Sequence, residues 1–174
     1  TFLNLCFNSS KAAKISLQPL ERFDIDFIIL FSDILVVPHA LGQFVDFKEK
    51  VGPILEPINS KFDLNYSKLT NNLRTLSPVS KTIKIIKKKN KEKDLIGFCG
   101  GPFTVLTYMI EGGTSTKHEK IKLKLIKEKK ELLEIIEILI ELSSMYLIEQ
   151  IKSGADVVKI FESWAGLLDE EEYY

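Results

Sequence analysis

Cysteine and histidine are scarce in this sequence, and each occurs only twice. Cys6 and Cys99 lie far apart and form no CxxC pair, so the sequence predicts neither a disulfide framework nor a structural zinc site, and it suits a reducing cytoplasm. His39 and His118 have no partner at metal-ligand spacing. We interpret both as loop or helix-end histidines.

A net charge is also absent, because 24 basic residues balance 24 acidic ones. Without an overall positive field, the sequence predicts no nucleic-acid partner. The lysine-rich stretches 84–93 and 117–130 alternate with apolar residues at helical period, so we interpret them as solvated helix faces rather than basic patches. No apolar run approaches the roughly 20 residues that span a bilayer, and no secretory signal pattern occurs. We therefore expect a cytoplasmic protein without a membrane partner.

The 174 residues are 45% apolar and 28% charged, which is typical of a globular protein with one core. The sequence starts at Thr1 without a methionine and stops at EEYY, shortly after a strand-like segment. We expect residues 1–174 to be a single partial domain of a longer polypeptide.

Three short and continuous apolar runs predict strands that are buried on both faces, as in parallel sheets covered by helices. They are Phe27–Phe31, Leu95–Phe98 and Ala155–Phe161. The segments around them predict helices. One is capped by Ser9 or Ser10 and broken at Pro19, and a second is opened by a Ser77 cap and Pro78. A third, PFTVLTYMI, is ended by Gly112-Gly113, and a long helical tract from about Lys117 to Lys152 has two pieces that meet near Lys127–Lys130 and is closed by Ser153-Gly154.

This alternation predicts an α/β fold with parallel strands, either an open doubly wound sheet or part of a (β/α)8 barrel. A complete barrel usually takes about 250 residues. The length and the three strands favour a partial (β/α)8 TIM barrel with helices outside.

Polar or glycine residues follow all three predicted strands. Ser32-Asp33 follow the first, 99–102 the second and 162–166 the third. Because the carboxyl ends of parallel strands share one rim, a site is expected there. Gly100-Gly101-Pro102 opens a helix whose amino end favours an anion, although a tight turn without a ligand fits equally. The stretch matches neither GxGxxG nor a P-loop, and no nucleophile–histidine–acid set is visible.

Asp33 interrupts the apolar stretch FIILFSDILVVPHALG, where an unpaired buried carboxylate would be costly. From the pattern alone, it either caps a loop, pairs with a lysine or meets a ligand. Tyr108 also has two interpretations: an ordinary half-buried tyrosine, or a hydroxyl directed into a cavity.

Three segments together resemble the uroporphyrinogen decarboxylase family in order and spacing: ILFSDILVVPHALG, GFCGGPFTVLTYMIEGGTS and GADVVKIFESWAG. LQPLERF resembles the helix that precedes the first of them. The likeness runs from about Phe2 to Tyr174 and is loosest in the lysine-rich helices.

The resemblance implies a dimeric (β/α)8 barrel that works without cofactor or metal. Its expected activity is that of a lyase in haem biosynthesis, which decarboxylates the four acetate groups of uroporphyrinogen III to coproporphyrinogen III. It further implies that Asp33 binds the pyrrole N–H groups and supports catalysis, that Tyr108 and Ser163 contact substrate side chains, and that Phe98 lines an apolar cleft.

The match also has departures. An arginine-rich segment resembling RQAGRY and a histidine segment resembling LGHG are expected in the family and do not occur in these residues. Arg22 and Arg74 lie in predicted helices, and Phe103 stands where a tryptophan is common. Two alternatives therefore remain: a non-catalytic half-barrel remnant or interaction module, and a methyltransferase of the same superfamily, which would need zinc ligands.

Overall fold

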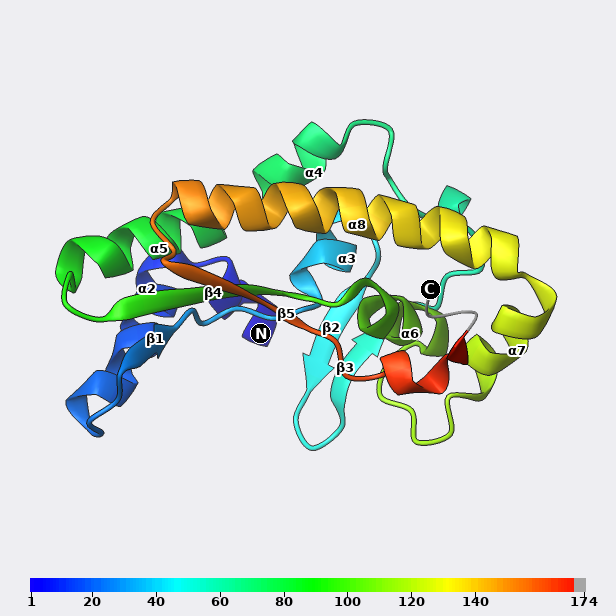
Figure 1. Ribbon diagram of the computed structural model, residues 1–174, viewed down its shortest axis with the longest axis horizontal. Coiled ribbons are helices and arrows are strands. Elements are labelled where there is room, and N and C mark those ends of the chain that lie inside the picture. Colours follow the sequence, from blue (N-terminus) through cyan, green and yellow to red (C-terminus); the bar gives the residue numbers. More distant parts are fainter. Residues whose placement is uncertain (171–174) are drawn as a thin grey trace.

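Figure 1 shows the computed structural model of the chain, which describes residues 1–170. The EEYY ending, and with it the end of the expected 1–174 domain, lies outside the described residues. The strands are β1 Phe27–Ile29, β2 Val45–Lys48, β3 Gly52–Leu55, β4 Asp94–Gly100 and β5 Val157–Phe161. The helices are α1 Phe2–Cys6, α2 Ser9–Leu17, α3 Val36–Ala40, α4 Leu69–Thr75, α5 Ser77–Lys89, α6 Pro102–Glu111, α7 Glu119–Lys127 and α8 Lys129–Lys152, with 3-10 turns η1 Gln18–Glu21, η2 Lys61–Asp63 and η3 Ala165–Leu167.

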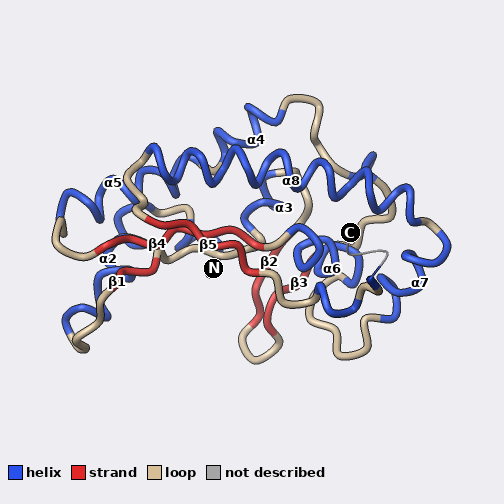
Figure 2. The backbone as a smooth tube through the Cα atoms, viewed as in Figure 1, coloured by secondary structure: helices blue, strands red, loops and turns tan. Residues whose placement is uncertain are grey.

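The main sheet is parallel and has the strand order β1-β4-β5. Ile28 of β1 pairs with Leu95 of β4, and Phe98 of β4 pairs with Lys159 of β5. The tube in Figure 2 shows these three strands running side by side with helices between them in sequence. The three predicted strands and the partial-barrel architecture are confirmed, and β1 ends two residues earlier than predicted.

One face of this sheet is covered by helices, and the other is open. α8 lies along the sheet in Figure 1, and α2 packs beside β1 and α5. Ile28 is fully buried, whereas its neighbours Phe27 and Ile29 are 45% and 59% exposed, because successive strand residues point to opposite faces. The prediction of burial on both faces is therefore wrong for β1 and β5, whereas β4 is buried on both faces from Gly97 to Gly100. A closed barrel fills its interior with side chains from all eight strands, and three strands cannot supply them.

Two predicted helix caps are also wrong, although the helices are present. The α2 cap is Asn8, whose side chain accepts a hydrogen bond from the Lys11 N–H, rather than Ser9 or Ser10. α5 begins at Ser77 but is preceded by Leu76, which also ends α4 and therefore leaves no turn for a serine cap. The break at Pro19 is confirmed, since α2 gives way to the turn η1.

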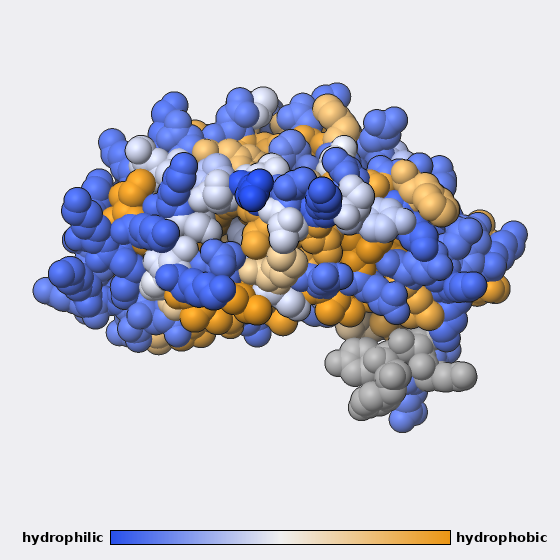
Figure 3. Space-filling view, turned by 90° about the horizontal axis from the view of Figure 1, so that it is seen from above, coloured by the Kyte–Doolittle hydropathy of each residue, from blue (hydrophilic) through white to orange (hydrophobic). Residues whose placement is uncertain are grey.

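The long helical tract divides at Glu128 into α7 and α8, within the predicted junction. α6 ends at Gly112 in the left-handed region (φ 85°), and α8 ends at Ser153 before Gly154. Figure 3 shows the face over α4 and α8, which is mostly hydrophilic with apolar side chains between the charged ones. On α5, Lys84 is exposed while Ile83 is buried, which confirms the solvated-face interpretation for that helix. No helix within residues 1–170 is long and apolar enough to cross a membrane.

The sequence interpretation missed an antiparallel hairpin formed by β2 and β3. Its turn places Lys50 and Gly52 at positive φ, 65° and 96°. A bridge from Ile54 to Gly113 ties it to the end of α6. Alternation over FVDFK and the glycine that follows were the signals that could have indicated it.

Candidate functional site

The residues that follow β1, β4 and β5 meet at one rim, as predicted. The Gly101 N–H donates to the Phe161 carbonyl at 2.8 Å, which joins the ends of β4 and β5. A Cβ on Gly100 would lie 2.9 Å from the Cβ of Ile34, next to Asp33. The rim therefore brings together three segments that are up to about 130 residues apart in sequence.

Beyond this point β1 leaves the sheet, and a side chain takes its place. The Leu30 N–H donates to the Ile96 carbonyl, so the even-numbered residues of β4 direct their backbone N–H and C=O groups toward β1. At Phe98, however, the partner is Gln150 of α8: its Oε1 accepts the Phe98 N–H at 2.8 Å, and its Nε2 donates to the Phe98 carbonyl at 2.9 Å. Gln150 is fully buried and satisfies both groups, which frees the chain after Leu30 to bend away and carry Asp33 to the rim.

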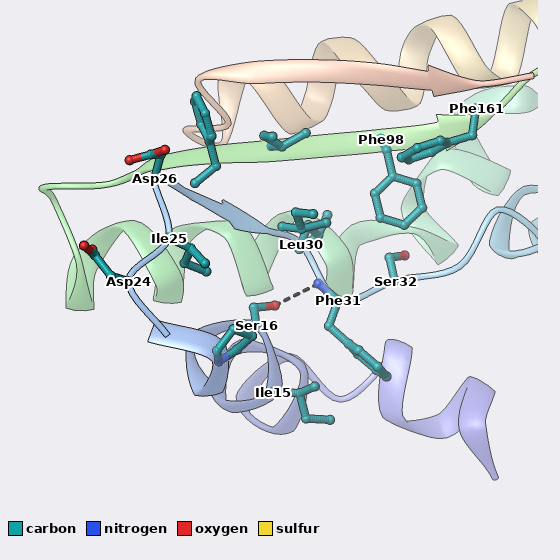
Figure 4. A pocket seen from close by; sticks show the side chains of 14 residues that line it. Ile15, Ser16, Asp24, Ile25, Asp26, Leu30, Phe31, Ser32, Phe98 and Phe161 are labelled. Carbon is teal, nitrogen blue, oxygen red and sulfur yellow. Dashed lines mark hydrogen bonds between the residues drawn. The ribbon is translucent and has the colours of Figure 1, made fainter. Parts of the chain in front are cut away.

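A cleft of about 770 Å³ lies beside this divergence, between the open sheet face and the region of α2 and η1. Figure 4 shows Phe98 and Phe161 at one end of it, with Ser32 nearby and with the Ser16 hydroxyl accepting the Phe31 N–H at 2.8 Å. The rings of Phe98 and Phe161 pack edge to face at 5.4 Å. Of the four predicted site residues, Phe98 lines this cleft, while Asp33, Tyr108 and Ser163 are not among its lining residues.

Asp33 is a largely buried carboxylate at the rim. Its Oδ1 accepts the Leu35 N–H at 2.8 Å, and burial raises its pKa more than this hydrogen bond lowers it. Burial also raises the pKa of Tyr108, and the Asp33 charge raises it further, while the Thr114 side chain lowers it. Asp33 and Tyr108 therefore interact electrostatically, although neither is hydrogen-bonded to the other within residues 1–170.

A buried layer of weakly polar groups lies behind Asp33. Tyr146 of α8 is fully buried, and its pKa is raised chiefly by burial. The Ser32 hydroxyl lies close enough to lower that pKa, but neither hydroxyl makes a hydrogen bond of normal geometry within residues 1–170. Cys6 and Cys99 are free buried thiols with pKa values raised to about 12 and about 11, mainly by burial. These neutral neighbours offer Asp33 no compensating positive charge.

The amino end of α6 holds an anion that belongs to the chain itself. The Glu162 carboxylate accepts the Thr104 N–H at 3.1 Å and the Thr104 hydroxyl. The predicted anion-binding turn at Gly100-Gly101-Pro102 is therefore occupied by a side chain. A ligand anion would have to displace Glu162 to use this helix end.

Ser163 and Trp164 follow Glu162 on the same loop. The Ser163 N–H donates to the Thr104 hydroxyl at 2.8 Å, and its side chain is exposed. The Trp164 ring lies against Tyr108 at 4.5 Å between centroids and against His118 at 4.7 Å. Trp164 thus connects the loop that carries Ser163 to Tyr108 of α6.

The remaining sequence expectations are placed as follows. His39 lies in the last turn of α3 and His118 is the N-cap of α7, so both are helix-end histidines. Arg22 and Arg74 are exposed, and Phe103 is buried in the core. Within residues 1–170, no group of three His, Cys, Asp or Glu side chains is placed to hold a metal ion.

Thr104, Glu162 and Gln150 were missed as parts of the site. Glu162 was noticed only as the first residue of a polar loop. Gln150 had no signal of its own, because a glutamine in a helix is ordinarily a solvated residue. Its two bonds to Phe98 span 52 residues and exist only in the folded chain.

Parallel strands with helices outside, and a rim of polar residues at the strands' carboxyl ends, define a segment of a (β/α)8-type barrel protein. A methyltransferase from Methanosarcina mazei has this fold with a TM-score of 0.78 over 99% of this chain and 54% of its own, at 21% sequence identity. The chain belongs to the uroporphyrinogen decarboxylase family, whose model, Uroporphyrinogen decarboxylase (URO-D), matches residues 1–174.

Curated relatives agree with this family. The chain is 46% identical to the uroporphyrinogen decarboxylase of Rickettsia bellii (strain RML369-C), over 99% of this chain and 51% of that protein. It is 43% identical to the uroporphyrinogen decarboxylase of Chelativorans sp. (strain BNC1), again over 99% of this chain and 51% of that protein. The chain thus spans about half the length of the curated relatives it matches.

Proposed function

We propose that residues 1–174 carry part of the substrate site of a uroporphyrinogen decarboxylase, acting in haem biosynthesis on uroporphyrinogen III to give coproporphyrinogen III. The observation that carries the proposal is the Asp33 carboxylate, which is largely buried, accepts one backbone N–H, and forms no ion pair within residues 1–170. A buried carboxylate is costly unless donors meet it. The four pyrrole N–H groups of a folded tetrapyrrole are donors of the right kind and number.

The chemistry suits a fixed carboxylate. When a pyrrole ring takes up a proton on carbon, it becomes an electron sink for the bond between the acetate methylene and its carboxylate. That bond breaks, carbon dioxide leaves, and the methylene is then protonated while the ring returns its proton. Each acetate therefore loses carbon dioxide and gains one proton. Asp33 would stabilise the positive charge that develops on the ring.

The other predicted residues have roles consistent with their positions. Tyr108 interacts electrostatically with Asp33, and its hydroxyl would contact a substrate carboxylate. Ser163 has an exposed side chain on the loop after β5 and would do the same. Phe98 lines the cleft and would lie against the apolar faces of the pyrroles.

The test is turnover of uroporphyrinogen III by the natural polypeptide that contains this chain, with products separated by their number of carboxylates. Asp33→Asn should lower kcat/KM by about 100-fold or more, as when a group that stabilises transition-state charge is removed. Asp94→Asn is the matched control, because Asp94 is exposed at the amino end of β4. Equal activities of the two variants would refute the role of Asp33.

Residues 1–174 alone should be inactive, because the arginine segment expected from the family does not occur in them. Steady turnover by this segment would contradict that expectation. The absence of turnover by the natural polypeptide would favour a non-catalytic half-barrel instead.

We further propose that residues 1–174 are the amino-terminal-to-middle part of one barrel domain, in a cytoplasmic homodimer that binds no nucleic acid. Balanced charge and two free buried thiols support the location and the lack of a nucleic-acid partner. The open apolar sheet face, with Phe27 and Ile29 exposed, supports a domain that continues beyond these residues. Light scattering after gel filtration, with and without added RNA, tests the assembly.

A further inference from the structure

The loop after β5 is fastened to the first turn of α6 by two side chains, Thr104 and Glu162. These two residues are 58 positions apart. Thr104 is only 2% exposed, although threonine is usually a surface residue. Glu162, by contrast, is exposed at the rim, so the contact joins a buried threonine to a surface carboxylate and calls for an account beyond simple packing.

The Thr104 hydroxyl uses its whole hydrogen-bonding capacity. It donates to Glu162 Oε1 and accepts the N–H groups of Ser163 at 2.8 Å and of Trp164 at 3.1 Å. A hydroxyl offers one donor and two acceptor positions, so all three are filled. Among side chains of similar size, serine alone could replace it.

The Glu162 carboxylate adds further hydrogen bonds. We call the hydrogen-bonded set of Thr104 and Glu162 with the Ser163 and Trp164 N–H groups the clasp. The Oε2 of Glu162 accepts the Thr104 N–H at 3.1 Å, and its Oε1 also accepts the Trp164 N–H at 3.1 Å. The negative charge lies at the amino end of α6, where the helix dipole favours it. The carboxylate fits because residue 101 is glycine: a Cβ there would lie 2.7 Å from the Cβ of Glu162.

The clasp therefore determines where two successive site residues lie. The two loop N–H groups that the Thr104 hydroxyl binds belong to Ser163 and Trp164, and the Trp164 ring in turn packs on Tyr108 at 4.5 Å. Tyr108 lies on the same helix as Thr104, one turn further along. The loop after β5 therefore contacts α6 at two points, through hydrogen bonds at Thr104 and through the Trp164 ring at Tyr108.

We propose that Thr104 and Glu162 are positioning residues, which hold Ser163 and Trp164 against Tyr108 in the geometry that receives the substrate's carboxylate side chains. The step from loop geometry to substrate rests on the proposed function. The step from the clasp to the loop does not, and it can be tested without turnover.

Trp164 is the only tryptophan of the chain and reports the loop directly. In Thr104→Val its emission should shift to the red and its quenching by acrylamide should rise at least twofold, because the loop loses the three hydrogen bonds that the Thr104 hydroxyl makes with Glu162, Ser163 and Trp164. Thr104→Ser should restore the wild-type signal. Thr107→Val is the matched control: Thr107 is equally buried in α6, and its hydroxyl bonds the Phe103 carbonyl rather than the loop.

The same variants in the natural polypeptide test the consequence for substrate. Thr104→Val should raise KM for uroporphyrinogen about tenfold and change kcat less, because contacts to substrate side chains are made before the chemical step. Thr104→Ser should restore KM, and Thr107→Val should leave it unchanged. If the natural polypeptide does not turn over uroporphyrinogen, the proposed function fails while the fluorescence test still decides the clasp.

An unchanged Trp164 signal in folded Thr104→Val would overturn the inference, as would an equal shift in Thr107→Val or a failure of serine to restore the signal. If Thr104→Val does not fold by circular dichroism, Glu162→Gln decides. It replaces one acceptor oxygen with a donor and should move the Trp164 signal in the same direction. An unmoved signal in that folded variant overturns the inference.

Discussion

Replacing Gln150 with methionine should destabilise the chain by far more than a typical helix substitution. Methionine has a similar length and is apolar, so it keeps most of the packing and removes only the two hydrogen bonds to Phe98. The N–H and carbonyl of Phe98 would then be buried without partners, since β1 has already left this edge of β4. Each unsatisfied group costs about 1–3 kcal/mol, which gives a loss of roughly 4 kcal/mol.

The assay is urea unfolding together with hydrogen exchange at the Phe98 amide. The free energy of unfolding should fall by about 4 kcal/mol, a large share of the total for a typical domain, and the Phe98 amide should lose its protection. Gln18→Met is the matched control, because Gln18 is half-buried in η1 and has no side-chain hydrogen bond described within residues 1–170. Its cost should be below about 0.5 kcal/mol.

An independent route to the same contact is Gly97→Ala. The new Cβ would collide with the Gln150 amide and would lie 3.3 Å from its Cδ. Since both changes break one contact, the double variant should cost less than the sum of the single ones. The reasoning is refuted if Gln150→Met loses less than about 1 kcal/mol with Phe98 still protected, or if the two costs add.

Two predictions concern pH. The pKa of Asp33 is raised on folding, so its contribution to stability is most favourable below the unfolded value of about 3.9 and is lost as the pH rises through the folded value. Asp33→Asn should therefore be more stable than the wild type at pH 7 and equal to it near pH 3 in urea titrations; a less stable variant at pH 7 would contradict this. Asp156 is the opposite case, because its pKa is lowered on folding. Its Oδ2 accepts hydrogen bonds from the Lys87 ammonium at 2.8 Å and from the Leu95 N–H at 2.7 Å, and both favour the carboxylate. Asp156→Ala should cost about 1 kcal/mol at pH 7, and the difference should shrink as the pH falls through the lowered folded pKa; a difference that does not shrink with falling pH would contradict it.

The sequence by itself determined the elements whose signals are local. The continuous apolar runs at β1, β4 and β5, the left-handed Gly112 after α6, and the break at Pro19 each depend on a few neighbouring residues, and all were predicted. The polar residues after each strand also indicated the rim, because parallel strands place their carboxyl ends together. These features follow from backbone sterics and from the period of apolar residues.

The tertiary structure alone decided what holds the rim in place. Nothing near Gln150 in sequence indicates that it replaces β1 at Phe98, and nothing near Thr104 indicates that it binds the loop at Glu162–Trp164. These hydrogen bonds join groups more than 50 residues apart, and they form only when the backbone of one element lacks a partner and a side chain of another can reach it. The open sheet face has the same origin: whether a strand residue is buried depends on the elements opposite it, and not on the strand itself.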